Sequence, residues 1–207
     1  MKKNLRILLF LTACVLLQTA CTPPKPAFEF IDHQLKIAVD PDNRQFIALD
    51  TVSIRYHKNI DSVYFLLRDS LRVERVGISH QSFRLIPLTA RKTKSVLALF
   101  SGCDPKAYEH AQIVQVCIPK SLFAHKMEIY YSGEIDLEQG IRLWYPQTPC
   151  TPATINVTAM LPSRFRLTLP GQSIDECTDN AWRICRWQVG KPQSDCPLKI
   201  ELVSEPL

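Results

Sequence analysis

Short runs in which apolar and polar residues alternate constrain this chain more than any other feature. Leu35, Ile37 and Val39 alternate with polar neighbours, and after a turn signal at 40–43 (DPDN) the alternation resumes over 52–56. A period of two places successive side chains on opposite faces of an extended strand. These two runs therefore predict a β-hairpin.

Segments of this kind recur along the chain, with turn residues between them. Helical patterns are limited to 105–111 and 119–124. The predicted strands are 34–39, 52–56, 63–67, 73–78, 83–86, 96–100, 113–118, 127–131, 141–145, 155–159, 165–169, 182–189 and 198–203. The run at 63–67 is apolar throughout, which suits a strand buried on both faces. The spacing predicts an all-β fold, a sandwich of roughly a dozen short, mainly antiparallel strands.

The N-terminus has the organisation of a bacterial lipoprotein signal peptide. Basic residues at 2, 3 and 6 precede an apolar stretch at 7–17, and Thr19 and Ala20 precede Cys21. Cys14 is the alternative, because 11–14 (LTAC) fits a lipobox better residue by residue. Cleavage there would halve the apolar stretch, and an uncleaved anchor would be too short to span a bilayer comfortably.

We therefore expect a signal peptide at 1–20, a lipidated Cys21 and proline-rich spacer at 21–27, and a single domain at 28–207. Diacylglyceryl and a further acyl chain, such as palmitate, would anchor the protein firmly. Thr22 stands where an aspartate retains enterobacterial lipoproteins in the inner membrane. The expected location is therefore the bacterial cell envelope, at the periplasmic face of the outer membrane.

The charge of the chain gives no argument for nucleic acid as a partner. The sequence has 25 basic and 20 acidic residues and a formal charge of +5, but three of the basic residues lie in the signal peptide. Without Lys2, Lys3 and Arg6 the charge falls from +5 to +2. We expect the membrane, through the lipid, and a protein as partners.

Six cysteines remain after the lipid site. An even number in an oxidising periplasm predicts up to three disulfides, and six cysteines allow 15 pairings. The pairs we favour are Cys103–Cys117, Cys177–Cys185 and Cys150–Cys196. The cysteine spacings suit no common zinc module, so we expect no metal site and no cofactor.

The segment 143–149 (LWYPQTP) is a candidate partner surface, because aromatic residues beside prolines make rigid contact surfaces. Trp144, Tyr145, Pro146 and Gln147 form this candidate. The alternative is that the two aromatic residues fill the interior of the sandwich. Trp182 and Trp187 are interpreted as core residues that pack beside a disulfide.

Several segments, in this order, resemble the N-terminal domain of aminopeptidase-N-type zinc metallopeptidases. They are 34–44 with 51–55, 61–67, 129–134 (IYYSGE), 144–149 (WYPQTP), 153–158 and the Leu-Pro pair at 161–162. In that family the region is a saddle-shaped β domain packed against a thermolysin-like catalytic domain. The resemblance implies this fold for most of the mature chain.

No catalytic constellation accompanies the resemblance. The chain has no H-E-x-x-H motif, its five histidines are scattered singly, and it has neither a G-x-S-x-G elbow nor a glycine-rich phosphate loop. We therefore expect no enzymatic activity, and predict a membrane-tethered accessory module that binds a protein or peptide. The alternative is the β subunit of a split zinc aminopeptidase whose catalytic domain is on another polypeptide. A purely structural role in the envelope is a third hypothesis.

Overall fold

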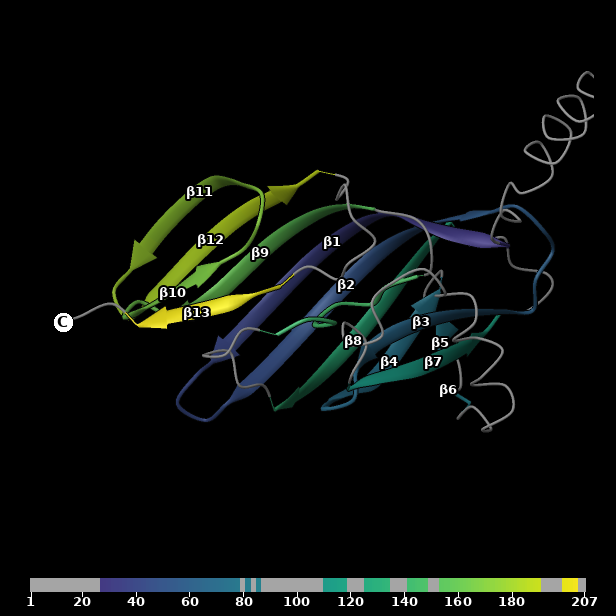
Figure 1. The fold of residues 1–207 in the computed structure, drawn as a ribbon, viewed down its shortest axis with the longest axis horizontal. Helices are drawn as coiled ribbons and strands as arrows, with labels where there is room; N and C mark the ends of the chain where they lie inside the picture. Colours follow the sequence, from purple (N-terminus) through teal and green to yellow (C-terminus); the bar gives the residue numbers. More distant parts are fainter. Residues whose placement is uncertain are drawn as a thin grey trace, which may run out of the picture.

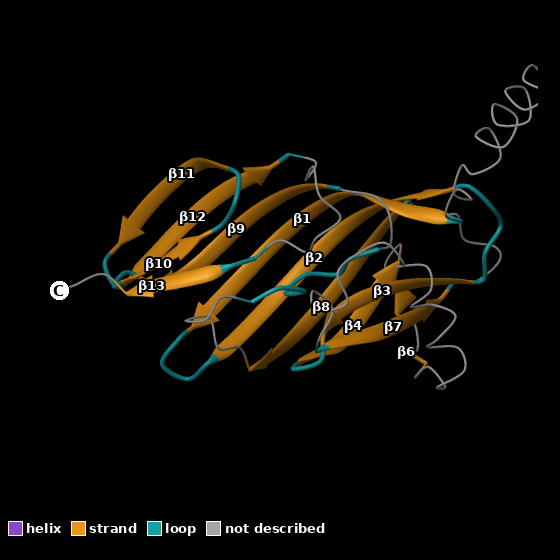
Figure 2. Ribbon diagram, viewed as in Figure 1, coloured by secondary structure: helices purple, strands orange, loops and turns teal. Residues whose placement is uncertain are grey.

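Strands form the regular structure of the residues that the computed structural model describes, which are 27–78, 81–82, 85–86, 110–118, 125–134, 141–148, 153–190 and 199–204 (Figure 2). They are β1 (Phe28–Asp40), β2 (Gln45–Tyr56), β3 (Ser62–Arg68), β4 (Leu71–Ile78), β5 (Gln81–Ser82), β6 (Leu85–Ile86), β7 (Ala111–Cys117), β8 (Lys126–Glu134), β9 (Thr154–Pro162), β10 (Phe165–Thr168), β11 (Gln172–Asp179), β12 (Trp182–Val189) and β13 (Glu201–Ser204). The all-β fold class is confirmed.

The largest sheet is mixed and has the order β11-β12-β9-β1-β2-β8-β4-β5. The opening hairpin pairs β1 with β2 from Phe28↔Tyr56 to Asp40↔Gln45. On its other side β1 runs parallel to β9, while the remaining neighbours in this sheet are antiparallel. The parallel pair joins the two halves of the chain at the centre of the sheet.

Two smaller sheets cover one face of the large sheet. The sheet β3-β7-β6 lies near its β4–β8 end, and β10-β13 lies near its β11–β12 end (Figure 1). In β1 the inward residues Leu35, Ile37 and Val39 are buried, whereas Gln34 and Lys36 on the other face are exposed. One hydrophobic core contains side chains from all three sheets. The predicted sandwich therefore has an inner and an outer face on its large sheet.

The segment 141–148 fills the space between the two smaller sheets. It makes isolated bridges to both sides, Leu66↔Gln147 and Ile141↔Ile200. The predicted strand at 141–145 is therefore wrong. Leu143 has a φ of 60°, in the left-handed region, and this conformation interrupts an extended run.

Most of the other strand predictions fall on observed strands, although β1 and β2 begin six and seven residues before the predicted bounds. The run at 63–67 becomes β3, and five of the six residues at 62–67 are buried, as expected for a strand covered on both faces. The prediction 182–189 reproduces β12, but β11 was not predicted. The predicted strand at 96–100 and most of the two helical segments lie outside the described residues, as does the signal peptide. None of the described segments forms a helix with the length and hydrophobicity that crossing a bilayer requires.

Candidate interaction surface

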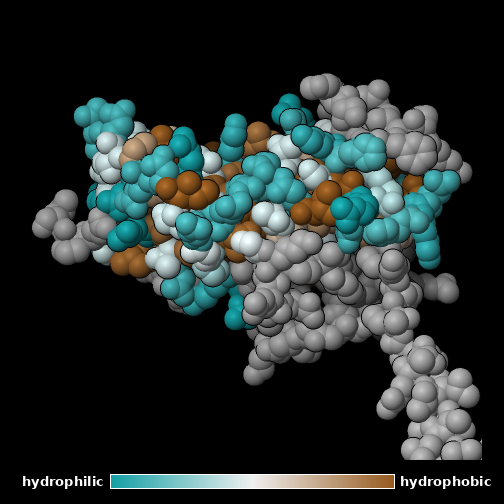
Figure 3. Space-filling view, turned by 90° about the horizontal axis from the view of Figure 1, so that it is seen from above, coloured by the Kyte–Doolittle hydropathy of each residue, from teal (hydrophilic) through white to brown (hydrophobic). Residues whose placement is uncertain are grey.

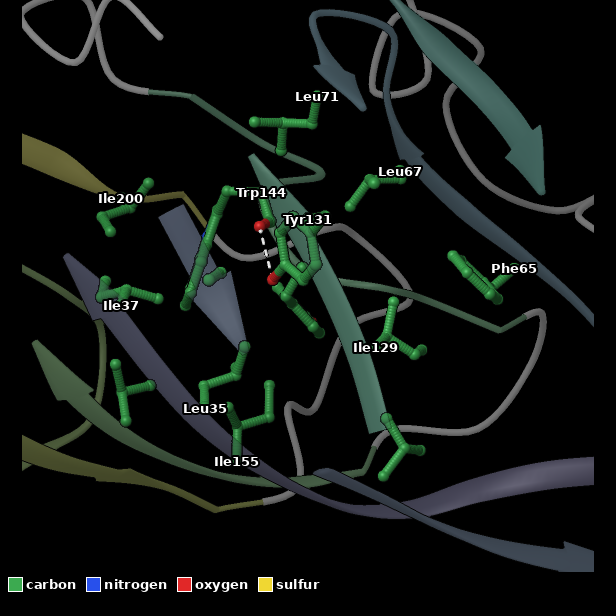
Figure 4. Packing of buried hydrophobic residues seen from close by; sticks show 14 of the residues in the cluster. Leu35, Ile37, Phe65, Leu67, Leu71, Ile129, Tyr131, Trp144, Ile155 and Ile200 are labelled. Carbon is green, nitrogen blue, oxygen red and sulfur yellow. Dashed lines mark hydrogen bonds between the residues drawn. The ribbon is translucent and has the colours of Figure 1, made fainter. Parts of the chain in front are cut away.

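The aromatic segment predicted as a partner surface is buried. Trp144 has 0% exposure, Tyr145 and Pro146 are also buried, and Gln147 is half-buried. Figure 4 shows Trp144 packed among core side chains beside Tyr131, whose hydroxyl donates a hydrogen bond to the Trp144 carbonyl at 3.1 Å. The partner-surface hypothesis for these residues is thus wrong, and the alternative, in which they fill the sandwich, is correct.

A buried hydrogen-bonded His–Asp pair supports this aromatic segment. His33 Nδ1 lies 2.7 Å from Asp50 Oδ2, and both side chains are almost completely buried. The His33 ring contacts Phe30 and Tyr145 edge-on, at centroid distances of 5.6 Å and 5.4 Å. The pair joins β1 to β2, where the hairpin register brings together residues far apart in the sequence.

The electrostatics of this cluster hold its tyrosines neutral. Burial raises the pKa of Tyr131 and of Tyr145 well above the usual range, and the Asp50 carboxylate adds to both shifts. Asp50 Oδ1 has no hydrogen-bond partner. A His–Asp pair is the arrangement of many catalytic dyads. Here it faces aromatic rings and no opening, so its evident role is to fix the packing of the segment 141–148.

The described residues offer no place for the catalytic zinc of a metallopeptidase. Among them, no group of three His, Cys, Asp or Glu side chains could hold a metal ion. We therefore assign no metal-dependent step to this part of the chain.

The predicted Cys177–Cys185 disulfide is not present. Both residues carry free thiols, Cys177 exposed and Cys185 buried. In the β11–β12 hairpin Cys177 is opposite Ile184, while Cys185 is opposite Glu176. Residues that are opposite each other point to the same side of a sheet, so the two sulfurs lie on opposite faces.

The other predicted cysteine sites fall largely outside the described residues. Cys117 ends β7 with a free thiol, and its predicted partner Cys103 is not described. The residues Cys150, Cys196, Cys21 and Cys14 also lie outside the described ranges. Their pairing and the lipidation of Cys21 stay predictions.

The outer face of the large sheet carries an apolar row that the sequence analysis missed. The register places Ile47, Ala38, Met160, Ile184 and Cys177 opposite one another on consecutive strands. We call this row the outer stripe. It crosses β2, β1, β9, β12 and β11, a distance of roughly 19 Å at the usual strand spacing. Figure 3 shows exposed apolar patches among hydrophilic residues on the face seen from above.

The outer stripe is accessible to solvent. Ile47 and Met160 are each 40% exposed, and Ala38 and Ile184 are half-buried. Trp182, two residues from Ile184 and on the same face, is 46% exposed. The interpretation of Trp182 as a core residue is therefore wrong, whereas Trp187 is buried as expected.

The stripe ends at β11, which is the edge of the sheet. All eight residues of β11 are exposed, and one long side of the strand has no neighbour among the described residues. Two of its three acids are paired within the hairpin: Asp175 with Arg186 at 2.9 Å, and Glu176 with Arg183 at 3.4 Å. An exposed edge strand is a template for pairing with another chain. The outer stripe and β11 together are the candidate interaction surface.

The sequence signal for this surface was weak. In β9 the outward Met160 interrupts an otherwise polar alternation, and in β2 an outward apolar pair, Ile47 and Leu49, does the same. A scan for apolar residues at the polar positions of predicted strands would have found both. Their alignment into one row depends on strand order, which the sequence pattern does not contain.

Comparison with known proteins gives matches in structure only. No protein-family model matches the chain, and no curated protein matches its sequence. An M1 zinc metallopeptidase from Deinococcus radiodurans superposes with a TM-score of 0.60 at 12% identity, over 86% of this chain and 42% of that one. A mutant of that enzyme bound to a Tyr-Ser-Ala substrate gives a TM-score of 0.59 at 13% identity, over 87% and 43%. A two-domain M1 zinc metallopeptidase mutant bound to L-tryptophan gives 0.59 at 14% identity, also over 87% and 43%.

The fold is that of the N-terminal part of M1 zinc metallopeptidases. The resemblance seen in the sequence is thereby confirmed at the level of fold. The chain spans less than half the length of the M1 structures it matches. An identity of 12–14% carries no catalytic or substrate-binding residue across.

Proposed function

We propose that this chain is a non-catalytic, lipid-tethered accessory module of the bacterial envelope, which binds a partner protein through the outer stripe and β11. The observation that carries the proposal is the apolar row that crosses five strands and ends at an unpaired edge. A partner strand added to β11 would gain main-chain hydrogen bonds, and its own sheet would extend over the stripe. The fold supports the accessory role, because it corresponds to a non-catalytic portion of the enzymes it matches.

Burial of the exposed apolar side chains supplies the affinity in this proposal. Contiguous exposed apolar surface marks interaction sites on soluble domains. Two of the three acids of β11, Asp175 and Glu176, are already paired with arginines of the same hairpin, so they add little long-range attraction. Recognition therefore depends on the shape of the stripe and on strand pairing.

Capture of the full-length protein from mildly solubilised membranes after brief crosslinking tests the proposal. The variant Ile47→Glu/Met160→Glu places two charges on the stripe and should lose the captured protein. Val203→Glu is the matched control, because Val203 is an exposed apolar residue on β13, outside the large sheet. Equal recovery of the same protein with the unmodified chain, the double variant and the Val203→Glu control would contradict binding through the stripe.

The second candidate function is the β subunit of a split zinc aminopeptidase. It is favoured by the coverage of the structural matches, in which more than half of the enzyme has no counterpart in this chain. Capture of a zinc peptidase that lacks its own β domain would support this candidate, whether or not the stripe variant loses that peptidase. Capture of envelope proteins with no peptidase among them would favour the accessory module.

A further inference from the structure

A cleft with a basic lining opens at the end of the sheet where the chain enters the fold. It lies where β1 begins, β2 ends and β8 begins, and it has a volume of about 810 Å³. That size is within the range of small-molecule sites. The polar residues that line it are Ser53, Arg55, Tyr56, His57, Lys58, Asn59, His125 and Lys126.

The lining has an excess of positive charge. Arg55, Lys58 and Lys126 are permanent cations, and His57 and His125 add two imidazoles. Among the described residues, Glu29 is the carboxylate that forms ion pairs with these side chains, with distances of 2.6 Å to Arg55 Nη1 and 3.4 Å to His57 Nε2. Lys58 and Lys126 form no ion pair with any described residue. The cleft therefore has uncompensated positive charge, and this charge favours an anionic ligand.

Tyr56 is a neutral member of the cleft lining. Its hydroxyl is buried and has no hydrogen-bond partner. Burial raises the pKa of Tyr56, so the hydroxyl keeps its proton at neutral pH. Tyr56 therefore adds no negative charge to the cleft, and the cationic side chains carry the attraction for an anion.

The tether enters the fold at this cleft. The carbonyl of Ala27 accepts hydrogen bonds from the backbone N–H groups of His57 and Lys58, at 2.9 Å and 3.2 Å. Ala27 is the last residue of the proline-rich spacer and stands six positions after Cys21. An extended proline-rich segment of that length spans roughly 20 Å. If Cys21 carries the lipid, the cleft is therefore held within this distance of the bilayer.

We propose that the cleft binds the phosphate of an anionic lipid headgroup, and so orients the domain on the membrane. The proposal rests on the membrane tether of the proposed function, and it is independent of the outer stripe. Cationic side chains near an anionic bilayer each contribute about 1 kcal/mol of attraction. With the cleft on the membrane, the β11 edge is left for a protein partner.

The test is a calorimetric titration of the purified full-length chain in micelles of a neutral detergent. The ligands are short-chain phosphatidylglycerol, phosphatidylcholine of the same chain length, and inorganic phosphate. We expect phosphatidylglycerol to bind with higher affinity than the other two. Lys58→Glu/Lys126→Glu should weaken its binding at least tenfold. Lys36→Glu/Arg75→Glu, the same charge change on exposed positions outside the cleft, should change it less than twofold.

Three outcomes would overturn the proposal. They are equal binding of the two lipids, phosphatidylglycerol binding unaffected by the cleft variant, and inorganic phosphate binding as tightly as phosphatidylglycerol. The last would assign the cleft to a free anion. Circular dichroism of both double variants checks that they are folded. Because the titration contains no partner protein, its result is separate from that of the capture experiment, and fractionation of Cys21→Ser tests the tether by itself.

Discussion

Each face of the large sheet contains one exception to the usual distribution of apolar residues inside and polar residues outside. On the inner face a histidine and a carboxylate, His33 and Asp50, are buried against aromatic rings. On the outer face Ile47 and Met160 are exposed in an apolar row. A buried polar pair is tolerated when its groups satisfy each other, and an exposed apolar row is typical of a surface that binds. We expect the inner face to determine stability, and under the proposed function the outer face binds the partner.

The largest expected effect comes from removing one member of the buried pair. His33→Phe keeps an aromatic ring between Phe30 and Tyr145 but leaves the Asp50 carboxylate unpaired in the core. We expect a loss of about 3–5 kcal/mol in the free energy of unfolding, measured by denaturant titration of the full chain.

A double variant separates the contribution of the His33–Asp50 pair to stability from that of the packing around it. His33→Phe/Asp50→Val removes both polar groups, and it should recover at least half of the stability that His33→Phe loses, because buried pairs are often replaceable by apolar residues. A loss below about 1 kcal/mol for His33→Phe, or no recovery in the double variant, would contradict the role assigned to the inner face.

The second prediction concerns close packing at the inner face. A Cβ on Gly133 would lie 2.1 Å from the Ser70 carbonyl oxygen, in the turn between β3 and β4. Gly133→Ala should therefore cost about 1–3 kcal/mol, because the backbone of that turn must move. Gly190→Ala is the matched control, since a Cβ there meets no atom within 4 Å. Equal denaturation midpoints for the two variants would show that the backbone of the turn moves at little cost, which would contradict the prediction.

The extent of successful prediction also differs between regions, and burial is the reason. The alternation in β12 arises from one covered face, so its bounds could be predicted from the sequence. β11 is exposed on both faces and has no alternation, so it was missed. The His33–Asp50 contact and the outer stripe depend on hairpin register and strand order. Leu143 adopts a left-handed conformation that no residue type at that position indicates.

The two cysteines of the β11–β12 hairpin sharpen the comparison, because Cys177 lies on the outer face and Cys185 on the inner face. Burial, with a smaller contribution from Glu176, raises the pKa of the Cys185 thiol to about 11. Since the thiolate is the reactive form, Cys177 on the outer face should be alkylated at least tenfold faster at pH 8. Peptide mapping of the native full-length protein after timed alkylation measures both rates. A peptide pair crosslinked through Cys177 and Cys185 would contradict the register of the hairpin.

The smallest expected effect on stability comes from the outer stripe itself. Met160 is exposed on β9, so Met160→Glu removes little buried surface and should change the free energy of unfolding by less than about 1 kcal/mol. Its inward neighbour Ala159 is fully buried between Ile37 and Cys185, and the same glutamate there should unfold the chain because its charge would lack a partner. Denaturant titration of the two variants compares the same glutamate side chain at adjacent positions of β9, which lie on opposite faces of the sheet. If Met160→Glu costs as much as Ala159→Glu, the outer stripe belongs to the folding core, and the exposed row would no longer support a partner in the capture experiment.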